Sequence, residues 1–446
     1  MADLLALSSQ IIDAGVASEP TNRVSQELSE LADDLALVES FSHVAVVRTG
    51  DGLVVVDASG AATGRAVVGA VRQWSSEPVR ALVYTHGHVD HVGGSGAFEA
   101  DRLAAGRPPF EVVGHANVPV RFDRYRRTDG WNRAINARQF GGISPRHGMG
   151  VGTPQAFLGD DVLAPDHLVD DHGTLTAGDV TLELHHARGE TDDHLWAWWP
   201  ERRTVFTGDF VTWVFPNAGN PQKVQRYPIE WAATLRRIVA LRPELLVPAH
   251  GLPIVGPERI ALVLDDMADA LEHLVASTLS LMNEGAPLDA IIHSVRLPAE
   301  RLERPWLKPV YDEPEFVVRN VWRQFGGWWD ANPATVLPAP EAALAAELAA
   351  LAGGAHRLAE RGAELSVAGE HRLACHLVEF AGRAAPDDRA VHELRAAVFQ
   401  ARRNASTSLM AKGIFADAAR QSRAVAERPA QATDPIEHRD GIEREP

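Results

Sequence analysis

The sequence predicts an α/β domain followed by an all-α region. Between His43 and His115, short β-branched runs alternate with a helical segment, and similar runs resume at Val180. After Gly256 the apolar residues keep helical spacing, and the stretch that follows Glu341 is rich in alanine and leucine. These patterns indicate a first half built on strands and a second half built on helices.

Composition narrows the function classes. At 446 residues the chain can form two or three domains with a sizeable core. The formal net charge of −17 argues against a nucleic-acid partner, because phosphates attract basic surfaces. A single cysteine, Cys375, excludes an internal disulfide and leaves nitrogen and oxygen atoms as metal ligands. No signal peptide and no apolar run of about 18 residues are visible, so we expect a cytoplasmic protein without a membrane span.

The elements of the first domain are predicted in order. Residues 1–40 are expected to form a helical lead-in, because Leu28, Leu31, Leu35 and Leu37 have roughly helical spacing. Strands are predicted over residues 43–49, 52–58, 80–85 and 110–115, each bounded by turn residues. Between the second and third strands, Ala66, Val67, Ala70, Val71 and Trp74 share one helical face. Strand, helix and strand then lead directly into a histidine-rich loop.

Residues 115–165 are expected to be irregular, since they are rich in Arg, Gly, Asn and Pro. Such a polar insertion predicts a wall of a substrate cleft, with a disordered excursion as the alternative. Further strands are predicted over residues 180–185, 195–199, 204–207 and 245–248.

The predicted domain limits follow from these changes in pattern. We expect a catalytic α/β domain over residues 41–265 and a helical domain over residues 266–427. Residues 428–446 are polar, charged and interrupted by proline, and are expected to be disordered.

The sequence THGHVDHVGG, residues 85–94, is the densest group of potential metal ligands. It places His86, His88, Asp90 and His91 immediately after a predicted strand, and two glycines allow the chain to fold tightly around them. Imidazole combined with carboxylate suits zinc better than calcium or magnesium. The alternative is a histidine-rich surface loop without a metal.

This stretch resembles the HxHxDH signature of the metallo-β-lactamase superfamily, which implies an αββα sandwich with one or two metals at one edge. HARGETDDH (186–194), FTGD (206–209) and PAHG (248–251) resemble the later ligand motifs. The resemblance implies His86, His88 and Glu190 on one ion, Asp90, His91 and His250 on the other, and Asp209 between them. His185, His186 and His194 are interpreted as supporting or packing residues.

A glutamate at the third ligand position looks like the type III alkyl sulfatases. WNRAINARQFGG (131–142) is similar to their NxMxRRxxYMYG segment, and residues 313–338 are close to the block that opens their dimerisation domain. The resemblance covers about residues 40–425. It implies a homodimer built on the helical region, without the sterol-carrier-like third domain that many of these sulfatases have.

The implied activity is hydrolysis of alkyl sulfate monoesters by a hydroxide held on two zinc ions. Asp90 and Asp209 are the candidate catalytic carboxylates, which bind metal and orient the nucleophile. A small anionic ester needs cationic and polar contacts, for which Arg138 and Arg226 are the leading candidates. The other candidate substrate contacts are Asn132, Asn136, Lys223 and Phe140, and Tyr125 and Trp131 are candidates for an alkyl channel.

Other functions stay open on the sequence alone. A hydrolase of the same fold acting on a thioester, lactone or phosphoester is the main alternative, and Asp209 favours it because aspartate usually bridges the metals there. A di-iron redox protein is a second alternative, which His88 argues against. A binding scaffold without activity is disfavoured, because all seven ligand positions retain a side chain able to coordinate metal.

Overall fold

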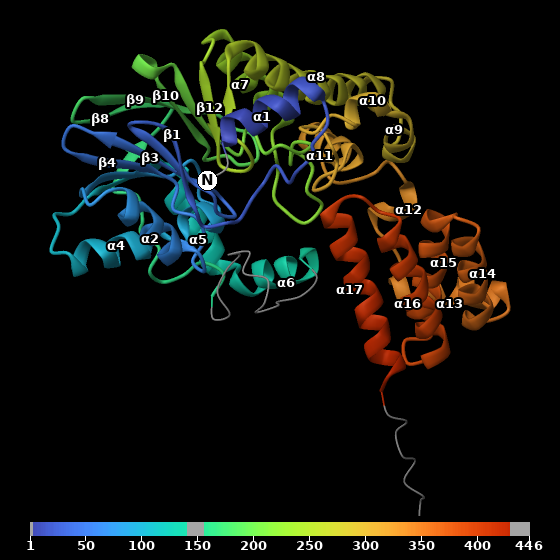
Figure 1. Ribbon diagram of the computed structural model, residues 1–446. Helices are drawn as coiled ribbons and strands as arrows, with labels where there is room; N and C mark the ends of the chain where they lie inside the picture. The colour runs from blue at the N-terminus through green and yellow to red at the C-terminus, as the bar shows by residue number, and fades with distance from the viewer. Residues whose placement is uncertain (1–2, 141–155, 429–446) are drawn as a thin grey trace, which may run out of the picture. The chain divides into compact units, whose positions relative to one another are not determined.

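The computed structural model describes residues 3–140 and 156–428 (Figure 1). The described chain divides into two compact units. Unit 1 contains the described parts of residues 3–337 together with residues 406–414, and unit 2 contains residues 338–405 and 415–428. The predicted disordered tail, residues 428–446, lies outside the described residues except for Arg428.

Two β-sheets form the centre of unit 1. Among the described residues, the first sheet has seven strands in the order β1-β2-β3-β4-β5-β6-β7. These are β1 (Leu28–Ala32), β2 (Leu35–Val38), β3 (Val44–Thr49), β4 (Gly52–Val56), β5 (Val79–Val83), β6 (Glu111–His115) and β7 (His167–Val169). The second sheet has six, in the order β13-β12-β11-β10-β9-β8. These are β8 (His172–Ala177), β9 (Val180–His186), β10 (Leu195–Trp199), β11 (Thr204–Gly208), β12 (Leu245–Pro248) and β13 (Ile254–Val255).

Helices cover the outer face of each sheet (Figure 1). One side carries α2 (Gly64–Trp74), α4 (Ser95–Ala104) and α5 (Asn117–Arg127), and the other carries α7 (Pro228–Ala240) and α8 (Pro257–Asn283). Adjacent strand residues alternate between the two cores, since Val46 packs in the outer core under α2 and Val47 packs in the core that includes the second sheet. The predicted αββα sandwich is therefore confirmed.

The structure corrects two predictions of local structure. Residues 28–38 form the hairpin β1–β2 and not a helix, and only α1 (Leu4–Ala14) is helical in the lead-in. The leucine spacing was misleading, because Asp33 and Asp34 form a turn between two short strands. Within the segment 115–165 that was predicted to be irregular, residues 117–127 and 129–139 form the helices α5 and α6 (Asp129–Gln139), and residues 141–155 lie outside the described residues. Pro119 and Gly130 lie in the first turns of these helices, where a helix tolerates them.

The remaining helices of unit 1 are short apart from α11. They are α3 (Val89–Val92), α9 (Leu288–Ser294), α10 (Ala299–Leu302), α11 (Pro314–Gly326) and α12 (Pro333–Val336), with a 3₁₀ turn at Pro200–Arg202. Helix α8 continues through residue 265 and packs with α7 in the large core. The predicted helical second half is confirmed, whereas the proposed domain boundary at residue 265 stays a prediction.

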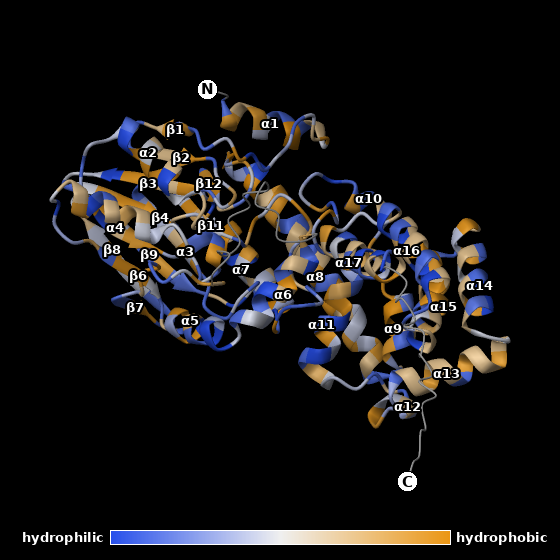
Figure 2. Cartoon of the chain, turned by 90° about the horizontal axis from the view of Figure 1, so that it is seen from below, coloured by the Kyte–Doolittle hydropathy of each residue, from blue (hydrophilic) through white to orange (hydrophobic). Residues whose placement is uncertain are grey.

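Unit 2 is all helical within its described residues. It consists of α13 (Glu341–Ala352), α14 (Ala355–Val367), α15 (His371–Ala384), α16 (Arg389–Asn404) and the greater part of α17 (Leu409–Ala426). Helix α13 is hydrophobic along most of its length, while α14 alternates polar and apolar residues (Figure 2). Leu351 of α13 is nonetheless 85% exposed.

Across residues 3–140 and 156–428, none of the helices combines the length and apolar character needed to cross a membrane. The cytoplasmic location stays a prediction.

Candidate active site

The predicted ligands meet at one edge of the sandwich because each follows the end of a strand. His86 and His88 follow β5, Asp90 and His91 lie in the short helix α3, Glu190 lies between β9 and β10, Asp209 follows β11, and His250 follows β12. Strands β4 and β5 are parallel, as are β11 and β12, so their carboxyl ends deliver these loops to the same place.

The donor atoms form two groups, each compact enough for one ion. His86, His88 and Asp209 offer atoms within 4.8 Å of one another, and so do Asp90, His91 and His250. The Asp209 carboxylate lies between the groups. Its Oδ2 is 3.8 Å from His86 Nε2, and its Oδ1 is 3.3 Å from His91 Nε2 and 3.4 Å from His250 Nε2. This geometry fits the predicted bridging role of Asp209.

The chemistry of the donors also fits a metal pair. Two of the atoms, His91 Nε2 and Asp209 Oδ1, are buried and lack a hydrogen-bond partner of good geometry among the described residues. Such atoms are costly unless something satisfies them. His91 is held from behind, since its Nδ1 lies 2.8 Å from Asp57 Oδ2. A carboxylate behind a histidine is the usual support of a metal ligand, because it fixes the ring orientation.

The surroundings of the cluster shift the pKa values of His86 and His91 in opposite directions. Burial, reinforced by the neighbouring histidines His91 and His88, holds the pKa of His86 well below its usual range, so this ring is neutral and able to coordinate. Burial also opposes protonation of His91, but the carboxylates of Asp209 and Asp57 outweigh it and hold its pKa well above the usual range. The cluster therefore holds excess negative charge close to His91, which a cation would neutralise.

Glu190 lies beside the first donor group but outside its compact set. Its Oε1 is 3.9 Å from His88 Nδ1. The same oxygen accepts a hydrogen bond of 2.5 Å from Asn217 Nδ2 and forms an ion pair with Arg226. Burial raises the pKa of Glu190 to about 7 even though Arg226 favours its charged form. Its role as a third ligand stays a prediction.

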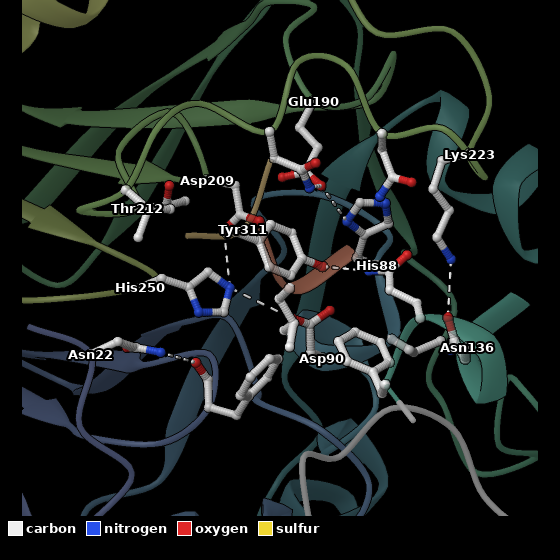
Figure 3. Close-up of a pocket in the computed structure, with 18 of the residues that line it drawn as sticks. Asn22, His88, Asp90, Asn136, Glu190, Asp209, Thr212, Lys223, His250 and Tyr311 are labelled. Carbon is white, nitrogen blue, oxygen red and sulfur yellow. Dashed lines mark hydrogen bonds and ion pairs between the residues drawn. The ribbon is translucent and has the colours of Figure 1, made fainter. Parts of the chain in front are cut away.

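A cavity of about 300 Å³ opens onto the donor atoms (Figure 3). His88, Asp90, Glu190, Asp209 and His250 face it. The rest of its wall is mainly apolar and aromatic around a small polar group. It consists of Asn22, Phe41, Val89, Tyr125, Asn136, Gln139, Phe140, Phe157, Thr212, Val214, Asn217, Asn220, Lys223, Arg226, Val310, Tyr311 and Leu409.

The polar group of the wall presents hydrogen-bond donors. Lys223 Nζ donates to Asn136 Oδ1 at 3.1 Å, as the dashed line in Figure 3 marks, and Asn220 Oδ1 accepts from the backbone of Gln222 at 3.1 Å. These bonds use the oxygen of each amide. The Nδ2 groups of Asn136 and Asn220 are buried and have no hydrogen-bond partner within the described chain. The Lys223 ammonium and two amide N–H₂ groups without a partner among the described residues therefore lie beside this part of the cavity, with both amide nitrogens buried under its wall.

The other predicted substrate contacts differ in position. Four of them line the cavity, namely Phe140, Asn136, Lys223 and Arg226. Arg138 and Asn132 are not among the described residues that line it. Arg138 donates to Gln222 Oε1 at 3.0 Å, and Asn132 Nδ2 donates to the Thr128 carbonyl. Of the proposed channel aromatics, Tyr125 lines the cavity, but Trp131 is 59% exposed and does not.

Several residues of the site carried no clear signal in the sequence. Asn217 and Asn220 lie in FPNAGNPQK, which has the composition of an ordinary turn. Tyr311 and Leu409 reach the cavity from more than 50 residues beyond the last ligand, and no local pattern predicts that contact. Asp57 had a detectable signal, because it is a carboxylate at the end of a buried strand.

Comparison with known families accounts for both halves of the chain. The model of the metallo-beta-lactamase superfamily matches residues 37–250, which contain every predicted ligand. The model described as alkyl sulfatase dimerisation matches residues 288–424. The chain joins a metallo-beta-lactamase domain to an alkyl sulfatase dimerisation domain. Proteins of the metallo-beta-lactamase superfamily bind metal ions, and the two donor groups are the candidate site for them in this domain.

Similar proteins match most of the length of this chain. A linear primary-alkylsulfatase of a Pseudomonas strain is 26% identical over 80% of this chain and 69% of its own length. An alkyl/aryl-sulfatase of Saccharomyces cerevisiae is 26% identical over 72% of this chain and 52% of its own length. The structure of a stereoselective inverting sec-alkylsulfatase from Pseudomonas matches with a TM-score of 0.78 at 23% identity, over 89% of this chain and 65% of that one. This chain spans between about half and just over two thirds of the length of these relatives.

Proposed function

We propose that this protein is a binuclear zinc hydrolase that cleaves sulfate monoesters of alkyl alcohols. The observation that carries the proposal is the group of donors that Lys223, Asn136 and Asn220 hold at the cavity beside the metal-ligand cluster, with both amide nitrogens buried and without a partner in the described residues. A sulfate group offers only acceptor oxygens and a negative charge, so it complements such a wall. The named alkylsulfatases among the related proteins support the same substrate class.

The ligand roles follow the donor groups. We propose that His86, His88, Glu190 and Asp209 hold one ion, and that Asp90, His91, His250 and Asp209 hold the other. Zinc ions bound there supply hydroxide near neutral pH, because they lower the pKa of water. We assign the role of orienting the nucleophile to Asp90 and Asp209, whose carboxylates lie 3.5 and 3.4 Å from His250 Nε2.

The substrate is then held from two sides. Lys223 and the two asparagine amides bind the sulfate oxygens. Arg226 acts differently, because its guanidinium pairs with Glu190 and donates to the Asn217 carbonyl at 2.8 Å. It therefore fixes the Glu190 carboxylate and adds positive charge nearby. The apolar wall, which includes Tyr125, Phe157 and Phe140, is suited to the alkyl chain.

A substrate panel on zinc-loaded protein tests the proposal. Linear, branched and aryl sulfates are compared with alkyl phosphates, thioesters and lactones of matched carbon number. We expect kcat/KM to be highest for alkyl sulfates and to rise with chain length while methylenes enter the cavity. Higher turnover of thioesters or lactones would reject the sulfatase proposal in favour of the alternative hydrolase.

We also propose that the protein is a homodimer. The family model over residues 288–424 is named for dimerisation, and exposed apolar side chains occur in that region of each unit. Trp328 is 71% exposed in unit 1, and Leu351 is 85% exposed in unit 2. Sedimentation at micromolar concentration should give a dimer, and Leu351→Arg or Trp328→Arg should weaken it if the side chain lies at the interface. A monomeric wild-type chain would contradict this proposal.

A further inference from the structure

The loop between β11 and α7 carries most of the polar cavity wall. We call residues 217–226 the anion loop, since Asn217, Asn220, Lys223 and Arg226 all line the cavity from it. The loop lacks regular secondary structure, although its side chains must hold fixed positions to recognise an ester. The question is therefore what fixes its backbone.

The backbone contacts come from residues about 90 positions later in the sequence. Asp312 is fully buried, and its Oδ2 accepts hydrogen bonds from the backbone N–H of Gly219 at 2.6 Å and of Asn220 at 3.2 Å. Its Oδ1 accepts from the N–H of Glu313 at 2.8 Å. Both carboxylate oxygens are thus used, and one of them reaches Asn220, whose side-chain nitrogen is buried beside the cavity without a partner in the described residues.

Two further contacts hold the same loop from α11. Asn320 Nδ2 donates to the Ala218 carbonyl at 3.0 Å and to the Arg226 carbonyl at 2.8 Å, so it joins the two ends of the loop. Gly219 lies directly on the first turn of α11. A Cβ at this position would be 2.4 Å from the backbone carbon of Phe316, so only glycine permits this approach.

We infer that Asp312 and Asn320 are positioning residues, which fix the anion loop so that Asn220 and Lys223 present their N–H groups to the substrate anion. Neither residue lines the cavity, so they act through the loop and not on the substrate. Both belong to the region matched by the dimerisation model, and this region therefore completes the site of its own chain. The inference rests on the proposed function, since it assumes that the loop binds an ester anion.

Asp312→Asn is the main test, because it keeps the shape of the side chain and replaces one accepting oxygen with a donor. Burial raises the pKa of Asp312 to about 7 although three backbone N–H groups favour the ionised form, so measurements are made above that pH. Asp289→Asn is the matched control, since Asp289 lies in the same region with its side chain 87% exposed. Both variants are assayed for zinc content, kcat, KM and the Kd of inorganic sulfate.

We expect Asp312→Asn to weaken sulfate binding and raise KM by about tenfold or more, the effect of losing one hydrogen bond to a charged group, with zinc content unchanged. Asn320→Ala should act in the same direction and serves if Asp312→Asn does not fold. Unchanged sulfate affinity in a folded variant would overturn the inference, and so would a parallel loss of zinc. If wild-type protein binds sulfate but hydrolyses no sulfate ester, a weaker Kd in the variants still supports the inference while the proposed activity fails.

Discussion

Replacing Lys223 by alanine should separate recognition of the sulfate group from recognition of the carbon chain. Among the described residues of the cavity wall, the Lys223 ammonium contacts neutral groups, the Asn136 amide oxygen and the Phe157 ring, whereas the Arg226 guanidinium is paired with Glu190. A hydrogen bond to a charged group contributes about 1.5 to 3 kcal/mol. Its loss corresponds to a fall in kcat/KM of about ten- to hundredfold for alkyl sulfates.

The assay compares the two halves of the substrate separately. Competitive inhibition by inorganic sulfate should weaken by the same factor as kcat/KM, while inhibition by the corresponding linear alcohol should stay unchanged. Lys308→Ala is the control, because Lys308 is an exposed lysine that does not line the cavity. If the alcohol and the sulfate ion weaken equally in Lys223→Ala, the variant has disturbed the whole cavity, and the assignment of Lys223 to the anion is refuted.

Three other outcomes follow from the same contacts. Burial lowers the pKa of Lys223 to about 8, so the ammonium is charged below that pH. The kcat/KM for sulfates should therefore fall as the pH rises through about 8, and Lys223→Arg should move this fall to higher pH. Asp57→Asn should weaken zinc affinity about 10- to 100-fold in a chelator competition, because Asp57 holds the ring of His91. Gly208 has φ +50°, and a Cβ at this position would be 2.4 Å from a histidine ring. Gly208→Ala should therefore lower the free energy of unfolding, measured by urea titration, by about 1 to 3 kcal/mol. The control Gly106→Ala should lower it by less, because φ is also positive there but the space is open.

The sequence predicted the sheets well because their residues report a local property. The runs that form β3 to β5 are β-branched and apolar, as nearly continuous burial on both faces requires, whereas β9 alternates buried with more exposed residues. The helix predicted over residues 28–38 was wrong, because the spacing of a few apolar residues does not distinguish a helix from two short strands. A few leucines three or four residues apart satisfy either period when a turn interrupts them, and the Asp33–Asp34 turn decides the outcome.

The candidate metal ligands could be chosen from the sequence because each follows a strand end, where the fold leaves little freedom. The candidate anion contacts could not be chosen in that way. Arg138 and Arg226 were chosen as cations close in sequence to ligand motifs, but charge alone does not say which partner a guanidinium already has. Tertiary contacts decide that question: Arg226 is engaged by Glu190, and Lys223 and Asn220 face the cavity because Asp312 and Asn320 hold their loop.

Metal and anion recognition are coupled in this cavity through charge. Asp90, Glu190 and Asp209 contribute −3 when ionised, and Lys223 and Arg226 contribute +2, so the wall has a net charge of −1 with neutral histidines. Although burial opposes it, the Asp209 and Asp90 carboxylates raise the pKa of His250, so without metal its protonation brings the wall close to neutral, and in a protein of net charge −17 such a cavity has little attraction of its own for a sulfate ester. If two divalent ions bind as proposed, they would add +4 and change the balance to +3. On that proposal the attraction that brings the anion into the cavity would come mainly from the metals, while the cationic wall would select and orient it, so sulfate binding is to be measured on zinc-loaded protein.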